Sequence, residues 1–195
     1  MNKSRLEAFS DGVFAIVITL LILDIRIPNV DYDHLGEALV GIMPHIIAYV
    51  MSFLVIGLYW IFHHNTAQLV QKVDRPFIWL NIVFLLFVSF MPFPTTLMGK
   101  YPFTQIPVLM YGANLLAANI TGWIITVYTY RRDHLKTESF TPAIYKRQMR
   151  VYLFVNGLYV LAMAITFINP TISYVVFAGV FVLLIMSTKS NKHGV

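Results

Sequence analysis

The sequence predicts an all-α integral membrane protein whose subunit crosses the bilayer with six transmembrane helices. Composition is the first reason, because 58% of the 195 residues are hydrophobic, only 12% are charged, and the mean hydropathy is +0.70. A soluble domain of this size needs more charged residues to cover its surface. Length is the second reason, since six stretches reach the roughly 20 mostly apolar residues that a spanning helix requires. The third is the placement of Lys and Arg, which fall almost entirely on one side of these stretches.

The six predicted helices follow one another in a single domain that takes up residues 1–195. In order, they occupy residues 6–27, 38–65, 76–98, 105–130, 145–168 and 170–188. Pro44, Pro92 and Pro107 fall within or near these spans, and membrane helices tolerate proline where neighbouring groups satisfy the freed carbonyls. Asn169 and Pro170 form a turn signal, so we expect the last two helices to form a tight hairpin.

The basic residues set the orientation, since cytoplasmic loops carry an excess of Lys and Arg. Twelve of the fourteen fall on one side: Lys3, Arg5, Lys72, Arg75, Arg131, Arg132, Lys136, Lys146, Arg147, Arg150, Lys189 and Lys192. The other side carries the remaining two and four acidic residues: Arg26, Lys100, Asp24, Asp31, Asp33 and Glu37. We therefore expect both termini to be cytoplasmic in a multi-pass protein of the cell membrane (inner or plasma).

Missing motifs exclude several classes of function. There are no cysteines, which excludes thiolate metal sites and cysteine nucleophiles. The chain has no H-E-x-x-H, G-x-S-x-G or glycine-rich phosphate loop, so we expect neither an enzyme nor a bound cofactor. His63 and His64 are not expected to bind a metal, because adjacent helical positions diverge by about 100°. The net charge of +5 is typical of cytoplasmic loops, and no nucleic-acid partner is expected.

The first predicted helix opens with the stretch "RLEAFSDGVF", which is rich in polar residues for a membrane span. An acidic residue near the centre of a span costs roughly 2.5–3.5 kcal/mol on insertion scales, and less towards its edge. Asp11 lies about one and a half turns inside the helix, so we expect it to have a partner. On a helical wheel Ser10 and Asp11 point about 120–140° away from Ile16. The polar pair is therefore expected to clamp this helix against its own subunit.

Another face of the same helix is almost wholly aliphatic. Ile16, Leu20 and Leu23 share this face with Phe9, and Thr19 borders it. Taken alone, such a stripe is typical of packing or of lipid contact.

Partners for the polar pair are available in the second and third predicted helices. The stretch "LYWIFHHNTAQLVQKVDRPFIWLN" supplies six polar side chains near the same cytoplasmic end: Trp60, His63, His64, Asn65, Asp74 and Asn81. A cluster of Asp, His, Asn and Trp would satisfy the hydrogen-bonding groups of every member inside the bilayer.

Together these motifs resemble the transmembrane protein 175 family of potassium channels, in its prokaryotic single-repeat branch. The family signature is an Arg, three residues and then Phe-Ser-Asp at the start of the first helix, present here as Arg5, Phe9, Ser10 and Asp11. Further matches are Trp60 with His63, Asp74 with Asn81, and "PFPT" at residues 92–95. The resemblance covers essentially the whole chain and implies that these residues form an interhelical network.

The resemblance also implies a homotetramer around a pore lined by the first helix, with potassium ions and the lipid bilayer as partners. The pore-facing positions of the family correspond to Ile16, Thr19, Leu20 and Leu23, with either Thr19 or Leu20 facing the axis. No T-V-G-Y-G-like filter is present, so selectivity has to come from rings of side chains that shed water and act as a hydrophobic gate. A modest preference for potassium is expected.

Two further expectations concern transport. The resemblance admits proton permeation, and Asp11 with His63 could either make the channel pH-sensitive or serve only as a structural clamp. The alternative function is a secondary cation transporter. Six spans are few for such a protein, and no pair of Gly/Pro-broken spans recurs in the two halves of the chain.

Overall fold

The computed structural model describes residues 2–189, with the backbone alone for residues 183 and 185–189. Lys192, from the predicted cytoplasmic end, lies outside these residues. The longer elements are α1 (Lys3–Leu20), α2 (Leu35–Gly41), α3 (Met43–Gln68), α4 (Arg75–Phe90), α5 (Pro92–Lys100), α6 (Gln105–Tyr130), α7 (Pro142–Ile165) and α8 (Pro170–Lys189). Two short 3-10 helices, η1 (Leu21–Asp24) and η2 (Tyr32–His34), lie between α1 and α2.

Within residues 2–189, five helical segments are long and apolar enough to cross a membrane: Lys3–Asp24, Met43–Gln68, Arg75–Lys100, Gln105–Tyr130 and Pro142–Ile165. In α8 the apolar stretch within the described residues, Pro170–Val182, is shorter. The all-helical class is therefore confirmed, whereas the count of six spans and the extent of the single domain stay predictions.

Several predicted helices end or break at other residues. The helix predicted over 6–27 ends at Asp24, beyond which Ile25 is extended. The helix predicted over 38–65 is divided into α2 and α3 at Ile42, and the one over 76–98 into α4 and α5 at Met91. Pro92 explains the second break, because proline lacks the N–H of a helical hydrogen bond and its ring clashes with the preceding turn. The helix predicted over 145–168 is shifted by three residues, and α6 has the predicted bounds.

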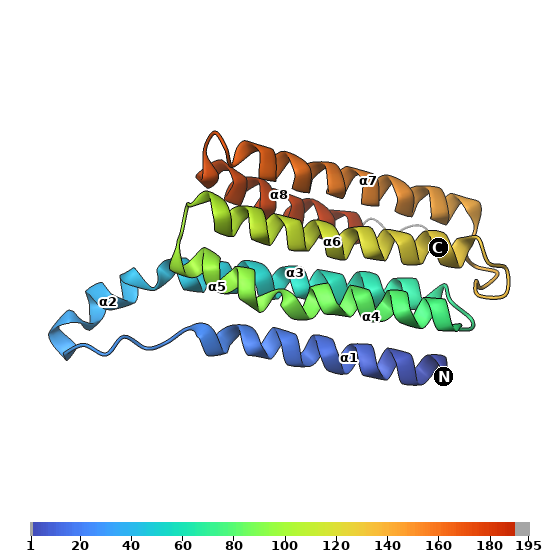
Figure 1. The fold of residues 1–195 in the computed structure, drawn as a ribbon, viewed down its shortest axis with the longest axis horizontal. Coiled ribbons are helices and arrows are strands. Elements are labelled where there is room, and N and C mark those ends of the chain that lie inside the picture. The colour runs from blue at the N-terminus through green and yellow to red at the C-terminus, as the bar shows by residue number, and fades with distance from the viewer. Residues whose placement is uncertain (1, 190–195) are drawn as a thin grey trace.

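The helices form an elongated bundle in which α1 lies at one edge and α7 with α8 at the other (Figure 1). Helix α6 packs against α4, α5, α7 and α8, whereas α1 packs mainly against α3 and α4. Its own subunit therefore covers only one side of α1.

Polar side chains join the helices in the interior of the bundle. The hydroxyl groups of Ser52 in α3 and Thr95 in α5 lie 2.7 Å apart, and the Tyr59 hydroxyl donates to a backbone carbonyl of α6 at 2.9 Å. Between α6 and α7, Asn119 Nδ2 donates to Asn156 Oδ1 at 2.7 Å. Such pairs satisfy groups that would otherwise be unfavourable in hydrocarbon.

The α3–α4 and α6–α7 loops lie at the same end of the bundle as the start of α1 (Figure 1). The two loops are joined by backbone hydrogen bonds from Gln71 N to Leu135 O at 2.7 Å and from Thr137 N to Leu69 O at 2.9 Å. The η2 and α2 segment, which carries acidic residues, extends from the other end. The basic loops and the acidic loop are thus at opposite ends of the bundle.

Candidate functional site

Helix α1 and the turn after it have two unlike faces. The face packed on the subunit is a buried stripe that recurs every three or four residues: Leu6, Ser10, Phe14, Val17 and Leu21. The uncovered face carries exposed side chains: Phe9, Ile16, Thr19, Leu20 and Leu23. Ile16 is 60% exposed and Leu23 is 71% exposed, so a largely apolar stripe points away from the rest of the subunit.

Ser10 joins α1 to two other helices. It is fully buried, and its hydroxyl donates to the carbonyl of Leu6 at 2.9 Å. The Ser10 oxygen accepts from Asn81 Nδ2 of α4 at 3.0 Å. Asn81 Oδ1 in turn lies 2.7 Å from His63 Nε2 of α3, which donates when that nitrogen carries the proton. This relay holds α1 at one rotation about its axis, because turning the helix would leave a buried amide and hydroxyl unpaired.

Asp11 has a different partner on α3. Its carboxylate accepts from the indole N–H of Trp60 at 2.9 Å. The Trp60 ring also stacks on His64, with centroids 5.8 Å apart and ring planes 26° apart. The acid is therefore turned towards α3 of its own subunit, on another side of α1 from Ile16.

Aromatic rings of α1, α3 and α4 also pack together in this region. Phe14 of α1 lies 5.7 Å from the ring of His63 and 6.2 Å from that of Phe84, and His63 and Phe84 stack with planes 11° apart. The sequence did not predict that Phe14 and Phe84 pack beside His63. The only signal for Phe14 is that it follows Ser10 by four residues, which places both on one face of a helix.

Asp74 belongs to a separate cluster at the end of the bundle. Its carboxylate caps α4 by accepting from the N–H of Phe77 at 2.9 Å, and it accepts from the Tyr128 hydroxyl at 2.7 Å. His134 Nε2 lies 3.7 Å away. Desolvation acts to raise the pKa of Asp74, but these donors outweigh it and lower the pKa below its ordinary value. Tyr128 and His134 were also missed, since no local pattern shows that the end of α6 returns to the start of α4.

Arg5, the first residue of the predicted network, is exposed on α1. Within residues 2–189, its side chain has neither a hydrogen bond nor an ion pair, so its role stays a prediction. No group of three His, Asp or Glu in this part of the chain is placed to hold a metal ion.

Thr19 and Leu20 are both exposed, on adjacent positions of the uncovered face. The Thr19 hydroxyl donates to the carbonyls of Ala15 at 3.0 Å and Ile16 at 2.8 Å. Its oxygen lone pairs are then left to accept from, or contact, a group outside the helix. After Leu20 the chain forms the 3-10 turn η1, in which side chains three residues apart come into line. This turn brings Leu23 into line with Leu20.

The arrangement has counterparts among known proteins. The family model described as "Endosomal/lysosomal potassium channel TMEM175" matches residues 5–92. A potassium channel of Chryseobacterium sp. (strain P1-3) is 34% identical over 175 residues, which cover 89% of this chain and 87% of that protein. The crystal structure of a lysosomal potassium-selective channel TMEM175 homolog from Chamaesiphon minutus matches with a TM-score of 0.79 at 34% identity. That match covers 97% of this chain and 98% of the other.

A vertebrate relative matches over a shorter stretch. The endosomal/lysosomal proton channel TMEM175 of Gallus gallus is 42% identical over 110 residues, which cover 52% of this chain and 22% of that protein.

The helical bundle and these likenesses define a membrane channel protein, and its relatives are channels rather than enzymes. Because the identity to the Chryseobacterium protein extends over 89% of the chain, the likeness is not confined to the Phe-Ser-Asp motif. The chain belongs to the TMEM175 family.

Proposed function

We propose that the chain is the subunit of a homotetrameric potassium channel of the cell membrane, with the α1 helices of the subunits around its conduit. The observation that carries this proposal is the apolar stripe on α1, in which Ile16 is 60% exposed and Leu23 is 71% exposed. The opposite side of α1 is packed on α3 and α4 of the same subunit. The potassium channels named among its relatives support the choice of ion.

Small residues on the uncovered side of α1 support contact between copies of this helix. Ala8, Gly12 and Ala15 are all exposed, and nothing lies within 4 Å of a Cβ built at Gly12. Their spacing of four and three residues places them along one side of the helix. Small side chains let two membrane helices approach closely, which suits a ring of α1 helices better than contact with lipid chains.

The polar contacts of α1 keep charge out of the proposed conduit. Asp11 is directed to Trp60 of α3, and Ser10 to Asn81 of α4. With these contacts in place, the uncovered face that carries Ile16, Leu20 and Leu23, with Thr19 beside them, is turned to the axis. The Asp11 and Ser10 contacts act as a clamp that orients the pore wall, with Arg5 and Asp74 at the same cytoplasmic end.

Selectivity in this proposal comes from side chains. The α1 segment has no proline to free its carbonyls for ions, and its backbone groups are used in helical hydrogen bonds. Rings of Ile16, Leu20 and Leu23 form narrow apolar collars that shed water and can close by dewetting. Potassium gives up its hydration shell more readily than sodium, so these collars favour potassium modestly.

Thr19 borders the apolar collars and lowers the cost of dehydrating a potassium ion there. The 3-10 turn aligns Leu23 with Leu20, so we place Leu20 on the axis and Thr19 at its side. The Thr19 oxygen, whose proton is donated within the helix, can replace part of the water that a potassium ion loses.

The acidic segment between α1 and α3 lies at the outer mouth in this proposal, since we place both termini in the cytoplasm. Its four acidic residues are Asp24, Asp31, Asp33 and Glu37, all exposed. Negative charge at a mouth raises the local concentration of cations. Proton permeation is a second candidate property, because a vertebrate relative is named a proton channel.

The test is flux through liposomes that contain the purified chain, with potassium or sodium as the permeant cation. Unitary currents and a mass of four subunits in detergent-corrected light scattering are expected; saturable flux without unitary currents would instead indicate a transporter. Thr19→Val is expected to lower the potassium-to-sodium permeability ratio. Thr96→Val is the matched control, because that hydroxyl also donates within its own helix, in α5. An unchanged ratio for Thr19→Val removes this residue from the selectivity mechanism.

A further inference from the structure

A partly open cavity of about 1030 Å³ lies between helices of the subunit, away from the uncovered face of α1. Its lining residues come from α1, α3, α4, α6, α7 and α8 and from the α3–α4 loop, one of the loops at the basic end of the bundle. Ligand pockets in proteins span roughly 300–1,000 Å³, so this cavity is large enough for a sizeable ligand.

Part of the cavity wall is apolar. Phe62 of α3, Val151 and Val155 of α7, and Leu184 of α8 line it. Helices α3 and α7 are apolar and long enough to cross a membrane, whose core consists of hydrocarbon chains. Such a wall is chemically suited to an acyl chain.

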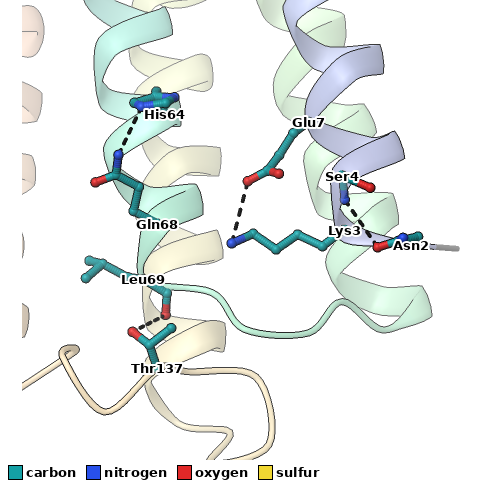
Figure 2. Close-up of polar contacts among 8 residues, drawn as sticks. All are labelled: Asn2, Lys3, Ser4, Glu7, His64, Gln68, Leu69 and Thr137. Atoms are coloured by element: carbon teal, nitrogen blue, oxygen red, sulfur yellow. Dashed lines mark hydrogen bonds and ion pairs between the residues drawn. The ribbon is translucent and has the colours of Figure 1, made fainter.

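The cavity wall also carries polar and charged side chains, with a net positive charge. Lys3 and Glu7 of α1 pair at 3.6 Å, and both line the cavity beside the end of α3 (Figure 2). Arg147 of α7 also lines it and has no ion pair among residues 2–189. The charges of Lys3 and Glu7 cancel, which leaves the charge of Arg147.

One lining group lacks the partner that its chemistry requires. The side-chain oxygen of Gln148 is buried and accepts no hydrogen bond within the described chain. Buried carbonyl oxygens in folded proteins nearly always have a donor, so this oxygen points to a ligand that carries an O–H or N–H group.

We propose that the cavity binds an anionic glycerophospholipid from the cytoplasmic leaflet, with an acyl chain against Phe62 and Val155. Its phosphate lies at Arg147, and a headgroup hydroxyl donates to Gln148. Basic pockets between membrane helices on the cytoplasmic side bind anionic lipid headgroups by the same combination of charge and apolar depth. The site lies within one subunit and does not depend on how ions cross the channel.

The test uses the purified, delipidated full chain and native mass spectrometry, with dioleoyl phosphatidylglycerol and dioleoyl phosphatidylcholine as probes. Phosphatidylglycerol is expected to bind the wild type about fivefold more tightly, the effect of one basic residue near a charged lipid. Arg147→Gln is expected to remove this preference. Arg150→Gln, the matched control on the same helix, does not line the cavity and is expected to keep it. Equal preference in the wild type and Arg147→Gln would overturn the proposal.

The apolar part of the site is tested separately. Val151→Trp fills the cavity and is expected to lower the binding of both lipids at least fivefold, whereas Leu153→Trp, at an exposed position outside the cavity, is not. Unchanged lipid binding in a folded Val151→Trp variant would contradict the proposal. Competition with sn-glycerol 3-phosphate distinguishes a lipid from a free phosphate. Displacement of phosphatidylglycerol by this soluble headgroup at equal concentration would show a headgroup site without an acyl chain, which also overturns the proposal.

Discussion

Replacing Asn81 with leucine removes the amide that joins α1 to α3 and α4. The side chain is 1% exposed and makes two hydrogen bonds, one with Ser10 Oγ at 3.0 Å and one with His63 Nε2 at 2.7 Å. The leucine side chain has the same number of heavy atoms and the same branching at Cγ, so it fills the space. The substitution therefore tests the hydrogen bonds rather than the packing.

The expected magnitude follows from what is left unpaired. His63 Nε2 loses its partner, whereas the Ser10 hydroxyl still donates to the Leu6 carbonyl. Leaving a buried polar group unsatisfied costs about 1–3 kcal/mol. Individual hydrogen bonds between membrane helices average only about 0.6 kcal/mol in double-mutant cycles, with a maximum near 1.7. We expect Asn81→Leu to lower the free energy of unfolding by about 1–3 kcal/mol, and its coupling to Ser10→Ala to be about 0.6 kcal/mol.

The assay is reversible unfolding of the purified chain in mixed micelles, for the wild type, Ser10→Ala, Asn81→Leu and the double variant. A control cycle combines Ser10→Ala with Asn119→Leu, because Asn119 bonds to Asn156 of α7 and not to α1. The control pair is expected to be additive. A coupling below about 0.3 kcal/mol for Ser10 with Asn81 would refute the inference that this contact orients α1.

Three further predictions concern other contacts. Trp60→Phe keeps a ring but removes the donor to Asp11, so the free energy of unfolding is expected to fall by about 1 kcal/mol at this exposed site. Trp79→Phe, at a 67% exposed position, should leave it unchanged; equal effects would contradict the pairing. Gly99→Ala places a Cβ 2.9 Å from His45 Cα, so unfolding should become about 1–3 kcal/mol easier. In Gly157→Ala the added Cβ meets nothing within 4 Å, so this control should be neutral or stabilising. A larger loss of unfolding free energy in Gly157→Ala than in Gly99→Ala would show that α3 and α5 are not in close contact. The pKa of Asp74 is lowered from an ordinary value of 3.8, despite desolvation, by its three donors. Its charge therefore stabilises the fold above pH 3.8, and this stabilisation is lost as the pH falls through the lowered value. The wild type should therefore have a higher free energy of unfolding than Asp74→Asn above pH 3.8, and this difference should disappear below pH 3.8. If the free energies of unfolding of the two proteins ran parallel across this pH range, the Asp74 cluster would be contradicted.

The long apolar runs could be read from the sequence because bilayer thickness sets the length of a spanning helix. The run 105–130 has the same bounds as α6. The break at Met91 was not predicted, although Pro92 was noted. Proline is tolerated in many membrane helices, and only packing against neighbours decides whether the helix continues.

The set of polar residues near the start of α1 was predicted more completely than their pairing. Depth in the membrane follows from topology, and it brings Trp60 and Asn81 to the level of Asp11. Rotation of each helix about its axis does not follow from topology. The structure pairs Asp11 with Trp60, Ser10 with Asn81, and Asp74 with Tyr128 in a different cluster. The cavity behind α1 was not predicted, because it arises from gaps between six helices and leaves no periodic signal in any one of them.

The proposed orientation of α1 towards the conduit is tested most directly by cysteine scanning, since the chain has no native cysteine. Single cysteines are placed at Ile16, Leu20 and Leu23, and at the buried positions Phe14 and Val17 as controls. A water-soluble methanethiosulfonate reagent reacts only with thiols that can ionise in water. We predict loss of potassium current on modification at the first three positions and unchanged current at the two controls. Block at Val17 with no effect at Ile16 or Leu23 would contradict the proposal that the apolar stripe of α1 lines the conduit.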